Sequence, residues 1–118
     1  MSAPPKTRLT PEEYNELERQ SEYKSEYYDG EIFAMSGASL KHNDIAVQLL
    51  LLIRQHARAK GCHTQTSDMR VRVSPRAYTY PDLTVVCGER EFADTGLDTL
   101  IHPTLIFGIS RRAPNSTI

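Results

Sequence analysis

The residue with the clearest potential for chemistry is Asp82, which stands directly before the apolar run 83–86. A carboxylate at the mouth of a buried strand is costly unless it is paired or binds a cation. Magnesium is a hard ion that takes oxygen ligands and keeps several of its waters. Asp82 is therefore a candidate ligand for a divalent metal. The competing interpretation is a loop aspartate that caps a turn.

A second carboxylate, Glu31, follows the pair Asp29-Gly30. That pair accepts positive φ and favours a tight turn between two strands. Glu31 is thus expected at the start of the second strand of a hairpin. By itself this position is also typical of an exposed glutamate beside a turn, and we weigh both interpretations.

Three basic or titratable residues are candidate contacts to DNA. His42 lies near the start of a predicted helix, where it could reach a phosphate or a site carboxylate, or lie on the surface. Arg70 and Arg72 occupy alternate positions of a predicted strand and so share one face, with Arg76 close by. Such a strip could meet DNA phosphates, whose contacts give affinity without sequence preference. A solvated strand face is the alternative.

The elements that must position these residues follow from capping signals and hydrophobic period. Thr10, Pro11 and Glu13 form a capping-box pattern that starts a helix. The spacing of apolar residues favours a long second helix that ends before Gly61. After it the period changes to two, which indicates strands. The predicted elements are helices 10–20 and 40–60, a hairpin over 26–35, strands 62–66, 69–73, 82–87 and 104–109, and an acidic loop over 88–100. They make an α+β or mixed α/β sheet domain.

The bulk properties narrow the class of protein. The chain has 118 residues, a net charge of -1, 39% hydrophobic and 25% charged residues, which is typical of one soluble domain. The near-zero charge gives no overall attraction to nucleic acid, and no apolar run predicts a membrane span. We expect a cytoplasmic protein without membrane contact. Cys62 and Cys87 fit no metal-site spacing, and in a reducing compartment we expect buried free thiols.

Five segments together resemble a known family. They are 8–14 (Arg-Leu-Thr-Pro-Glu-Glu-Tyr), 23–39 (from Tyr-Lys-Ser-Glu-Tyr-Tyr-Asp-Gly-Glu-Ile to Ser-Gly-Ala-Ser), His42, 67–71 (Ser-Asp-Met-Arg-Val) and 80–82 (Tyr-Pro-Asp). In this order and spacing they resemble the Uma-type putative restriction endonucleases of the PD-(D/E)xK nuclease superfamily. The resemblance extends from Arg8 to about Phe107. The block from the hairpin to the helix is specific, whereas the Pro-Asp pair alone is not.

The resemblance implies a restriction-endonuclease-like core, with a mixed sheet flanked by helices. It also implies a Mg²⁺-dependent phosphodiester hydrolase acting on DNA. Asp82 corresponds to the metal-binding aspartate of the family and Glu31 to its helix-proximal acidic residue. We therefore predict that the side chains of Glu31 and Asp82 point into one cleft.

The chain departs from this family at its next strand. The family pattern there is of the type Val-Glu-Val-Leu-Ser-Pro-Ser-Thr, followed by a helix with a basic residue. Here Gly108 stands in place of the glutamate, and glycine offers no ligand. We expect metal binding and catalysis to be impaired, in a domain that lacks its C-terminal elements. We also predict that Gly108 lies on a strand next to the one that begins at Asp82, with its Cα facing the same cleft.

The tail 110–118 suggests how the departure arose. It can be encoded by a nucleotide sequence which, read one base earlier, gives Leu-Ser-Pro-Ser-Thr-Glu-Leu-Tyr-Asp, the continuation that the family pattern leads one to expect. We hypothesise a one-base frameshift near Ile109, which the nucleotide sequence around that codon would test. The expected organisation is a flexible tail 1–9, a restriction-endonuclease-like domain 10–109 and an aberrant tail 110–118.

Two other functions stay open at this point. One is an active nuclease that recruits a replacement carboxylate such as Glu26 or Asp68. The other is a non-enzymatic module that binds DNA, or a second copy of the chain, through Arg70 and Arg72. Metal-dependent cleavage of plasmid DNA separates the first from an inactivated nuclease, and salt-dependent DNA binding without cleavage favours the second.

Overall fold

A computed structural model describes residues 8–35, 37, 39–93 and 96–109 of the chain. Both predicted helices are present, and the four longer predicted strands and the hairpin are found. Three short strands, β5, β7 and β8, were not predicted. The elements are α1 (Pro11–Gln20), β1 (Ser25–Tyr28), β2 (Glu31–Ala34), α2 (Leu40–Ala59), β3 (Cys62–Thr66), β4 (Arg70–Ser74), β5 (Ala77–Thr79), β6 (Leu83–Cys87), β7 (Glu91–Phe92), β8 (Thr99–Ile101) and β9 (Leu105–Phe107).

The strands form the mixed sheet that the resemblance implied and a second, smaller antiparallel sheet. A six-stranded sheet has the order β2-β1-β5-β4-β8-β7, in which β4 and β8 run parallel and the other pairs antiparallel. A three-stranded antiparallel sheet has the order β3-β6-β9. The fold class is confirmed as mixed α+β.

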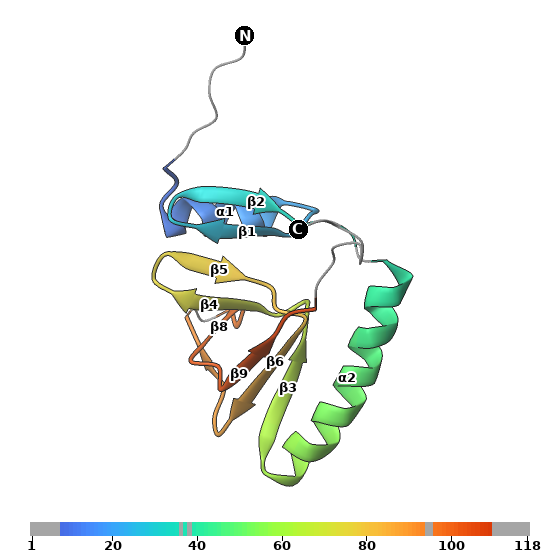
Figure 1. The fold of residues 1–118 in the computed structure, drawn as a ribbon. Helices are drawn as coiled ribbons and strands as arrows, with labels where there is room; N and C mark the ends of the chain where they lie inside the picture. Colours follow the sequence, from blue (N-terminus) through green and yellow to red (C-terminus); the bar gives the residue numbers. More distant parts are fainter. Residues whose placement is uncertain (1–7, 36, 38, 94–95, 110–118) are drawn as a thin grey trace.

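The two helices cover different parts of this framework. In Figure 1, α2 packs along β3 and β6, while α1 lies with the β1–β2 hairpin at the opposite side of the molecule. The α2 helix starts at Ser39, whose side chain accepts a hydrogen bond from the backbone N–H of His42. Of the α2 side chains, only His42 and Ala57 are buried. The helix therefore rests on the sheet along a narrow stripe.

The α1 helix is fixed by the predicted capping box. Thr10 Oγ1 accepts from the Glu13 N–H, and Glu13 Oε1 accepts from the Thr10 N–H. Its Tyr14 is fully buried and stacks on Tyr27 with ring centroids 5.0 Å apart, next to Tyr78. Aromatic burial of this kind joins α1 to the hairpin and to β5.

A second core joins the two sheets. Val71 of β4, Leu100 of β8 and Val86 of β6 form one buried cluster, with Met69 and Phe92 packed against it. Because Val86 belongs to the smaller sheet and the other two to the larger, this contact holds the sheets in a fixed relation. The strand that begins after Asp82 is thereby anchored.

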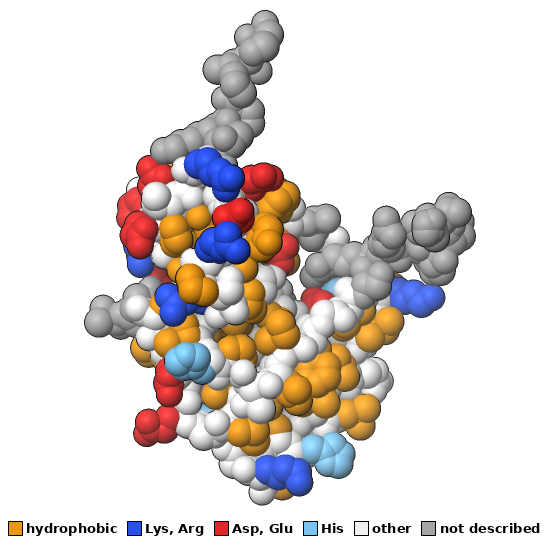
Figure 2. Space-filling view, turned by 60° about the vertical axis from the view of Figure 1, so that its left-hand side comes forward, with side chains coloured by type: hydrophobic (Ala, Val, Ile, Leu, Met, Phe, Trp, Pro, Cys, Tyr) orange, Lys and Arg blue, Asp and Glu red, His pale blue; other side chains and the backbone are white. Residues whose placement is uncertain are grey.

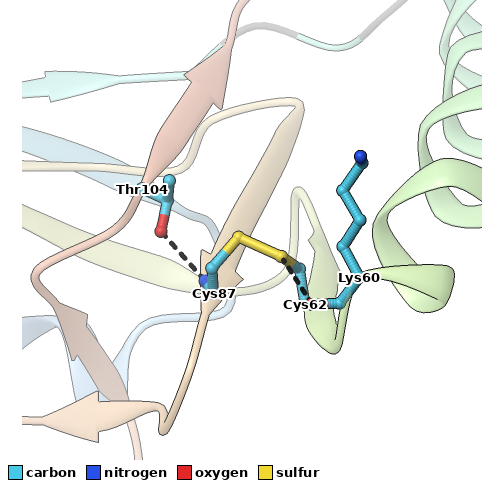
Figure 3. The surroundings of a disulfide bond; sticks show 4 residues. All are labelled: Lys60, Cys62, Cys87 and Thr104. Carbon is cyan, nitrogen blue, oxygen red and sulfur yellow. Dashed lines mark hydrogen bonds between the residues drawn. A yellow bond between two sulfur atoms is a disulfide. The ribbon is translucent and has the colours of Figure 1, made fainter.

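The expectation of free cysteine thiols is wrong. Cys62 and Cys87 form a disulfide, which Figure 3 shows linking β3 and β6. The antiparallel register of the two strands puts the residues directly opposite each other. The cysteines were expected to be buried, but Cys62 is half-buried and Cys87 is exposed. The spacing of the cysteines and the expected reducing compartment did not predict the disulfide. The pairing of β3 with β6, which brings the two residues together, was needed for that.

The predicted boundaries of the domain are only partly within the described residues. Arg8 and Leu9, placed by prediction in the flexible tail, contact the hairpin turn: the Leu9 N–H donates to the Gly30 carbonyl at 3.0 Å. Leu9 also packs against the tyrosine cluster. The predicted aberrant tail 110–118 lies outside the described residues. No described helix is long and apolar enough to cross a membrane.

Candidate functional site

The largest pocket among the described residues surrounds Asp82. It has a volume of about 550 Å³ and lies between the first half of α2, the end of β3 and the segment before β1. Polar and apolar side chains both line it. The lining residues are Glu22, Tyr23, Lys24, Met35, Gly37, His42, Asn43, Ala46, Val47, Leu50, Thr66, Ser67, Asp82 and Leu83.

Asp82 and His42 meet inside this pocket. His42 Nε2 lies 3.1 Å from Asp82 Oδ1, and the side chains are 6% and 8% exposed, His42 first. Neither ring nitrogen of His42 has a hydrogen-bond partner of good geometry within the described residues, and both are buried. A buried polar atom without a partner carries a free-energy cost of about 1–3 kcal/mol. The imidazole is thus held beside the carboxylate with unused capacity for a proton, a water or a ligand.

The other carboxylate oxygen of Asp82 touches the chain after β9. The Ile109 N–H donates to Asp82 Oδ2 at 2.7 Å. In the antiparallel pair of β6 and β9, Leu83 stands opposite Phe107. Continuing that register by one residue would place Gly108 opposite Asp82. The strand ends at Phe107, so Gly108 follows β9 directly and does not lie on a strand as predicted. A Cβ at Gly108 would meet nothing within 4 Å.

Glu31, by contrast, is not brought into this pocket. It is exposed at the start of β2, paired with Tyr28 beside the hairpin turn. The pocket lining includes Met35, beyond the end of β2, but not Glu31. Glu31 and Asp82 therefore do not line this pocket together, because the described part of the hairpin reaches it only at Met35, beyond the end of β2.

The basic strip is also different from the prediction. Arg70 is 4% exposed, and its Nε donates to Thr99 Oγ1 at 2.9 Å. Its guanidinium lies 5.4 Å from the centre of the Tyr14 ring. Arg70 is thus a core residue and cannot contact DNA in this structure. Arg72 is half-buried on β4, opposite Tyr78. The two do not form a solvated face.

Neither replacement carboxylate lines the pocket. Glu26 accepts a hydrogen bond from the Thr79 hydroxyl, and the side chain of Asp68 is 91% exposed and paired with Lys24 Nζ at 3.3 Å. Lys24 itself does line the pocket, and its Nζ also donates to the Ser67 carbonyl at 3.0 Å. We assigned it no role from the sequence. Lys24 lies within the segment 23–39 that resembles the family, but nothing in that pattern sets it apart from its neighbours.

The donor set can be tested against the magnesium ion that the family resemblance implies. Asp82 supplies carboxylate oxygens, and His42 a buried imidazole nitrogen without a partner. Within the described residues, no group of three His, Cys, Asp or Glu side chains could hold a metal. Magnesium prefers oxygen ligands in an octahedral arrangement. One carboxylate beside an imidazole does not fit that preference, so these residues alone do not make a magnesium site.

A hydrogen-bonded clamp holds the chain just before Asp82. The Tyr80 hydroxyl donates to Glu18 Oε2 at 2.6 Å, and the same oxygen accepts from the Ser25 N–H at 2.9 Å. Burial, and then the hydrogen bond to Glu18, raise the pKa of Tyr80 well above its ordinary value of 10.0. Burial, aided by the charge of Glu18, raises the pKa of Tyr14 to about 12. Both phenols must stay neutral in the folded protein.

This clamp predicts a loss of stability at alkaline pH. Below pH 10 both tyrosines are protonated in the folded and unfolded states, so their contribution is complete. Above pH 10 the unfolded chain loses these protons first, and the free energy of unfolding should fall by about 1.4 kcal/mol per pH unit for each tyrosine. Urea unfolding between pH 9 and 12 measures the slope. Tyr80→Phe should reduce it by about half; an equal slope in both proteins would refute the assignment to Tyr80.

Comparison with protein families gives one match that covers most of the chain. The family model described as "Uma2: Putative restriction endonuclease" matches residues 11–111. The matched range contains the whole of the pocket described above.

The chain is also similar to individual proteins and to a solved structure. Two uncharacterized proteins of Synechocystis sp. are 37% identical over 103 residues and 34% identical over 99 residues, covering 86% and 83% of this chain. The chain spans about half of their length, 53% and 56%. A solved structure, a putative nuclease belonging to DUF820 from Anabaena variabilis, has a TM-score of 0.62 at 20% identity. The aligned region includes 92% of this chain and 61% of the Anabaena chain. The similarity shows that the two proteins share a fold.

Proposed function

The chain belongs to the Uma2 family, and on this premise we propose that its Asp82 pocket is a restriction-endonuclease-like phosphodiesterase site for DNA, impaired by glycine at position 108. The observation that carries the proposal is the buried contact of Asp82 with His42 at the wall of the largest pocket. A buried carboxylate beside a titratable group in a cleft is a frequent sign of a functional site.

The residues of the pocket suit hydrolysis of a phosphodiester. In that reaction a water oxygen attacks phosphorus, one P–O ester bond breaks, and the leaving oxygen gains a proton. The His42 imidazole offers Nδ1 to take the proton of the water, because Nδ1 has no hydrogen-bond partner among the described residues while Nε2 lies against Asp82. The Lys24 ammonium on the same wall attracts the phosphate charge.

The proposed cofactor is Mg²⁺. When bound, such an ion neutralises the phosphate and lowers the pKa of its water. Asp82 is the residue that would hold it. We propose that its affinity is low in this chain, since Gly108 brings no carboxylate to the strand beside Asp82. Glu31 has no part in this proposed site, because it does not line the pocket.

A plasmid-nicking assay tests the proposal. Purified protein with Mg²⁺ or Mn²⁺ should nick supercoiled DNA slowly, and Asp82→Ala should remove the remaining nicking. We expect His42→Ala to lower the rate by about 10²-fold or more, the range found for a lost proton-transfer group. Glu31→Gln is the matched control, a carboxylate change outside the pocket, and should leave the rate unchanged. Nicking that survives Asp82→Ala would refute the assignment of the site. Rapid cleavage by the unmodified chain would refute the impairment.

A second candidate function is DNA binding without catalysis. It is favoured by arginines at the far end of α2 that have no carboxylate partner among the described residues. Under this alternative, a second copy of the chain is the other candidate partner. Metal-free DNA binding, with no nicking even after a carboxylate is introduced at position 108, would favour it over the nuclease.

A further inference from the structure

A second polar pocket lies at the C-terminal end of α2, away from Asp82. It has a volume of about 380 Å³ and lies between α2, β3 and the chain after β6. Its lining carries the cationic side chains of Arg54, Arg58 and Arg90 together with His63. No aspartate or glutamate lines it. In a chain of net charge -1, such a gathering of positive charge is a local feature.

The arginines of this pocket differ from others in the chain. Arg8 and Arg76 both pair with Asp29, at 3.5 and 3.2 Å. Arg54 and Arg58 form no ion pair with any described carboxylate. Arg90 donates to the side-chain oxygen of Gln65 at 3.1 Å, a neutral partner that leaves its charge uncompensated. The pocket therefore presents positive charge to solvent.

In Figure 2, acidic and basic side chains are mixed over the upper part of the molecule, which holds α1 and the hairpin. Hydrophobic side chains are frequent on the lower part of this face, with acidic side chains at its left and a basic side chain and a histidine at its lower end. Glu89 and His63 do line a neighbouring hollow with Arg90, so the positive character is concentrated towards α2.

The two pockets lie along the same side of α2. Asn43, Val47 and Leu50 line the Asp82 pocket, and Arg54 and Arg58 line the basic one. Residues spaced by three or four positions in a helix share one face. Both pockets are bordered by β3, through Thr66 at one end and through its first residues at the other. Both pockets are thus lined by the same face of α2 and by β3, at opposite ends of each.

We propose that the basic pocket holds a phosphate of the DNA backbone and so anchors a duplex whose other end reaches the Asp82 pocket. This inference rests on the proposed function. Asn43 and Arg54 lie about 17 Å apart along the helix axis. At 3.4 Å per base pair, this distance corresponds to roughly five base pairs. Arginine suits the role because its planar fork donates to two phosphate oxygens at once.

The experiment measures DNA binding by fluorescence anisotropy with a labelled duplex in EDTA, so that metal and cleavage play no part. Each phosphate contact is worth roughly tenfold in affinity at about 50 mM monovalent salt and about one unit of the salt slope. Arg54→Gln/Arg58→Gln should therefore weaken binding by about 10²-fold and reduce the slope by about two. Arg90→Gln, from a different element, should reduce the slope by about one.

The matched control is Arg8→Gln/Arg76→Gln, which makes the same change in net charge at the hairpin turn. Its affinity and slope should stay close to those of the unmodified chain. Equal losses in both double variants, or none in Arg54→Gln/Arg58→Gln, would overturn the proposal. Competition separates the two sources of phosphate: inorganic phosphate should displace DNA only at high concentration, and tight binding of free phosphate would overturn the backbone assignment. Because binding is measured in EDTA, a chain that binds DNA through this pocket but never nicks it would contradict the proposed function and leave this inference standing.

Discussion

Gly108→Glu should increase the affinity of the protein for Mg²⁺ or Mn²⁺ by at least about tenfold, which is 1.4 kcal/mol in binding free energy. The physical reason is the register of β6 and β9, which puts position 108 opposite Asp82. Side chains that stand directly opposite in an antiparallel pair share a face, with Cβ atoms about 5 Å apart. A glutamate there adds oxygen ligands, which magnesium prefers, beside the carboxylate already present.

The backbone at Gly108 accepts this change. The new Cβ would meet no atom within 4 Å, and Gly108 is not among the residues with positive φ. The gain should therefore come from the carboxylate rather than from strain or repacking. In the absence of metal, the two like charges should lower the stability of the variant slightly, and a divalent ion should reverse this. Because a ligand that binds only the folded state raises its stability, the melting temperature should rise with metal concentration.

Calorimetric titration with Mn²⁺ and Mg²⁺ measures the effect directly. Gly108→Gln is the matched control, since it has the same shape without the charge and should gain little. The combination Gly108→Glu/Asp82→Asn should lose the gain, because both carboxylates are needed. If Gly108→Glu binds metal no better than the unmodified chain, glycine at 108 is not what limits metal affinity. The same preparations in the nicking assay show whether restored binding also restores cleavage.

The position of Asp82 directly before a buried strand could be predicted from the sequence, because it depends on local signals. A proline, an aspartate and then an apolar run mark the mouth of a buried strand, and the structure has Asp82 directly before β6. The start of α1 was predictable for a similar reason, since the capping box Thr10–Glu13 needs only a four-residue segment. For His42, the sequence left open a contact with a phosphate or with a site carboxylate. Tertiary packing places it against the carboxylate of Asp82.

The placement of Arg70 and Glu31 could not be read from local pattern. Alternation correctly puts Arg70 and Arg72 on one strand, but it does not say which face is solvated. The guanidinium of Arg70 lies over the rings of Tyr14 and Tyr78 and donates to Thr99, and these contacts accommodate its charge in the core. Glu31 was assigned from the resemblance, and its distance from the pocket follows from the length and direction of β2. These are long-range facts of the fold.

The disulfide belongs to the same class of long-range fact. Cys62 and Cys87 are 25 residues apart, and nothing near either one signals the other. Their meeting requires that β3 and β6 pair with Cys62 opposite Cys87, a register fixed along all five residue pairs of the two strands. The expectation of a reducing compartment had favoured free thiols, and so the pairing was not predicted.

Loss of this disulfide should lower the free energy of unfolding by about 3–4 kcal/mol, the value expected for closing a loop of roughly this length in the unfolded chain. Cys62→Ser/Cys87→Ser tests this by urea denaturation against the oxidised protein. The substitution should leave no large cavity, because Cys62 is only half-buried and Cys87 is exposed. The loss should therefore come mainly from the unfolded state, whose freedom the bridge restricts.

Reduction of the unmodified protein provides the independent control. Dithiothreitol should produce the same loss of stability as the double substitution and should have no effect on the variant. A thiol titration under native conditions should detect no free thiol before reduction and two after it. The effect on function should be local, because the bridge lies at the end of β3 beside the basic pocket, whereas Asp82 lies at the other end. Cys62→Ser/Cys87→Ser in the Gly108→Glu background should accordingly retain the gain in metal affinity. Two free thiols in the untreated protein would instead show that β3 and β6 are held by strand pairing and core packing alone.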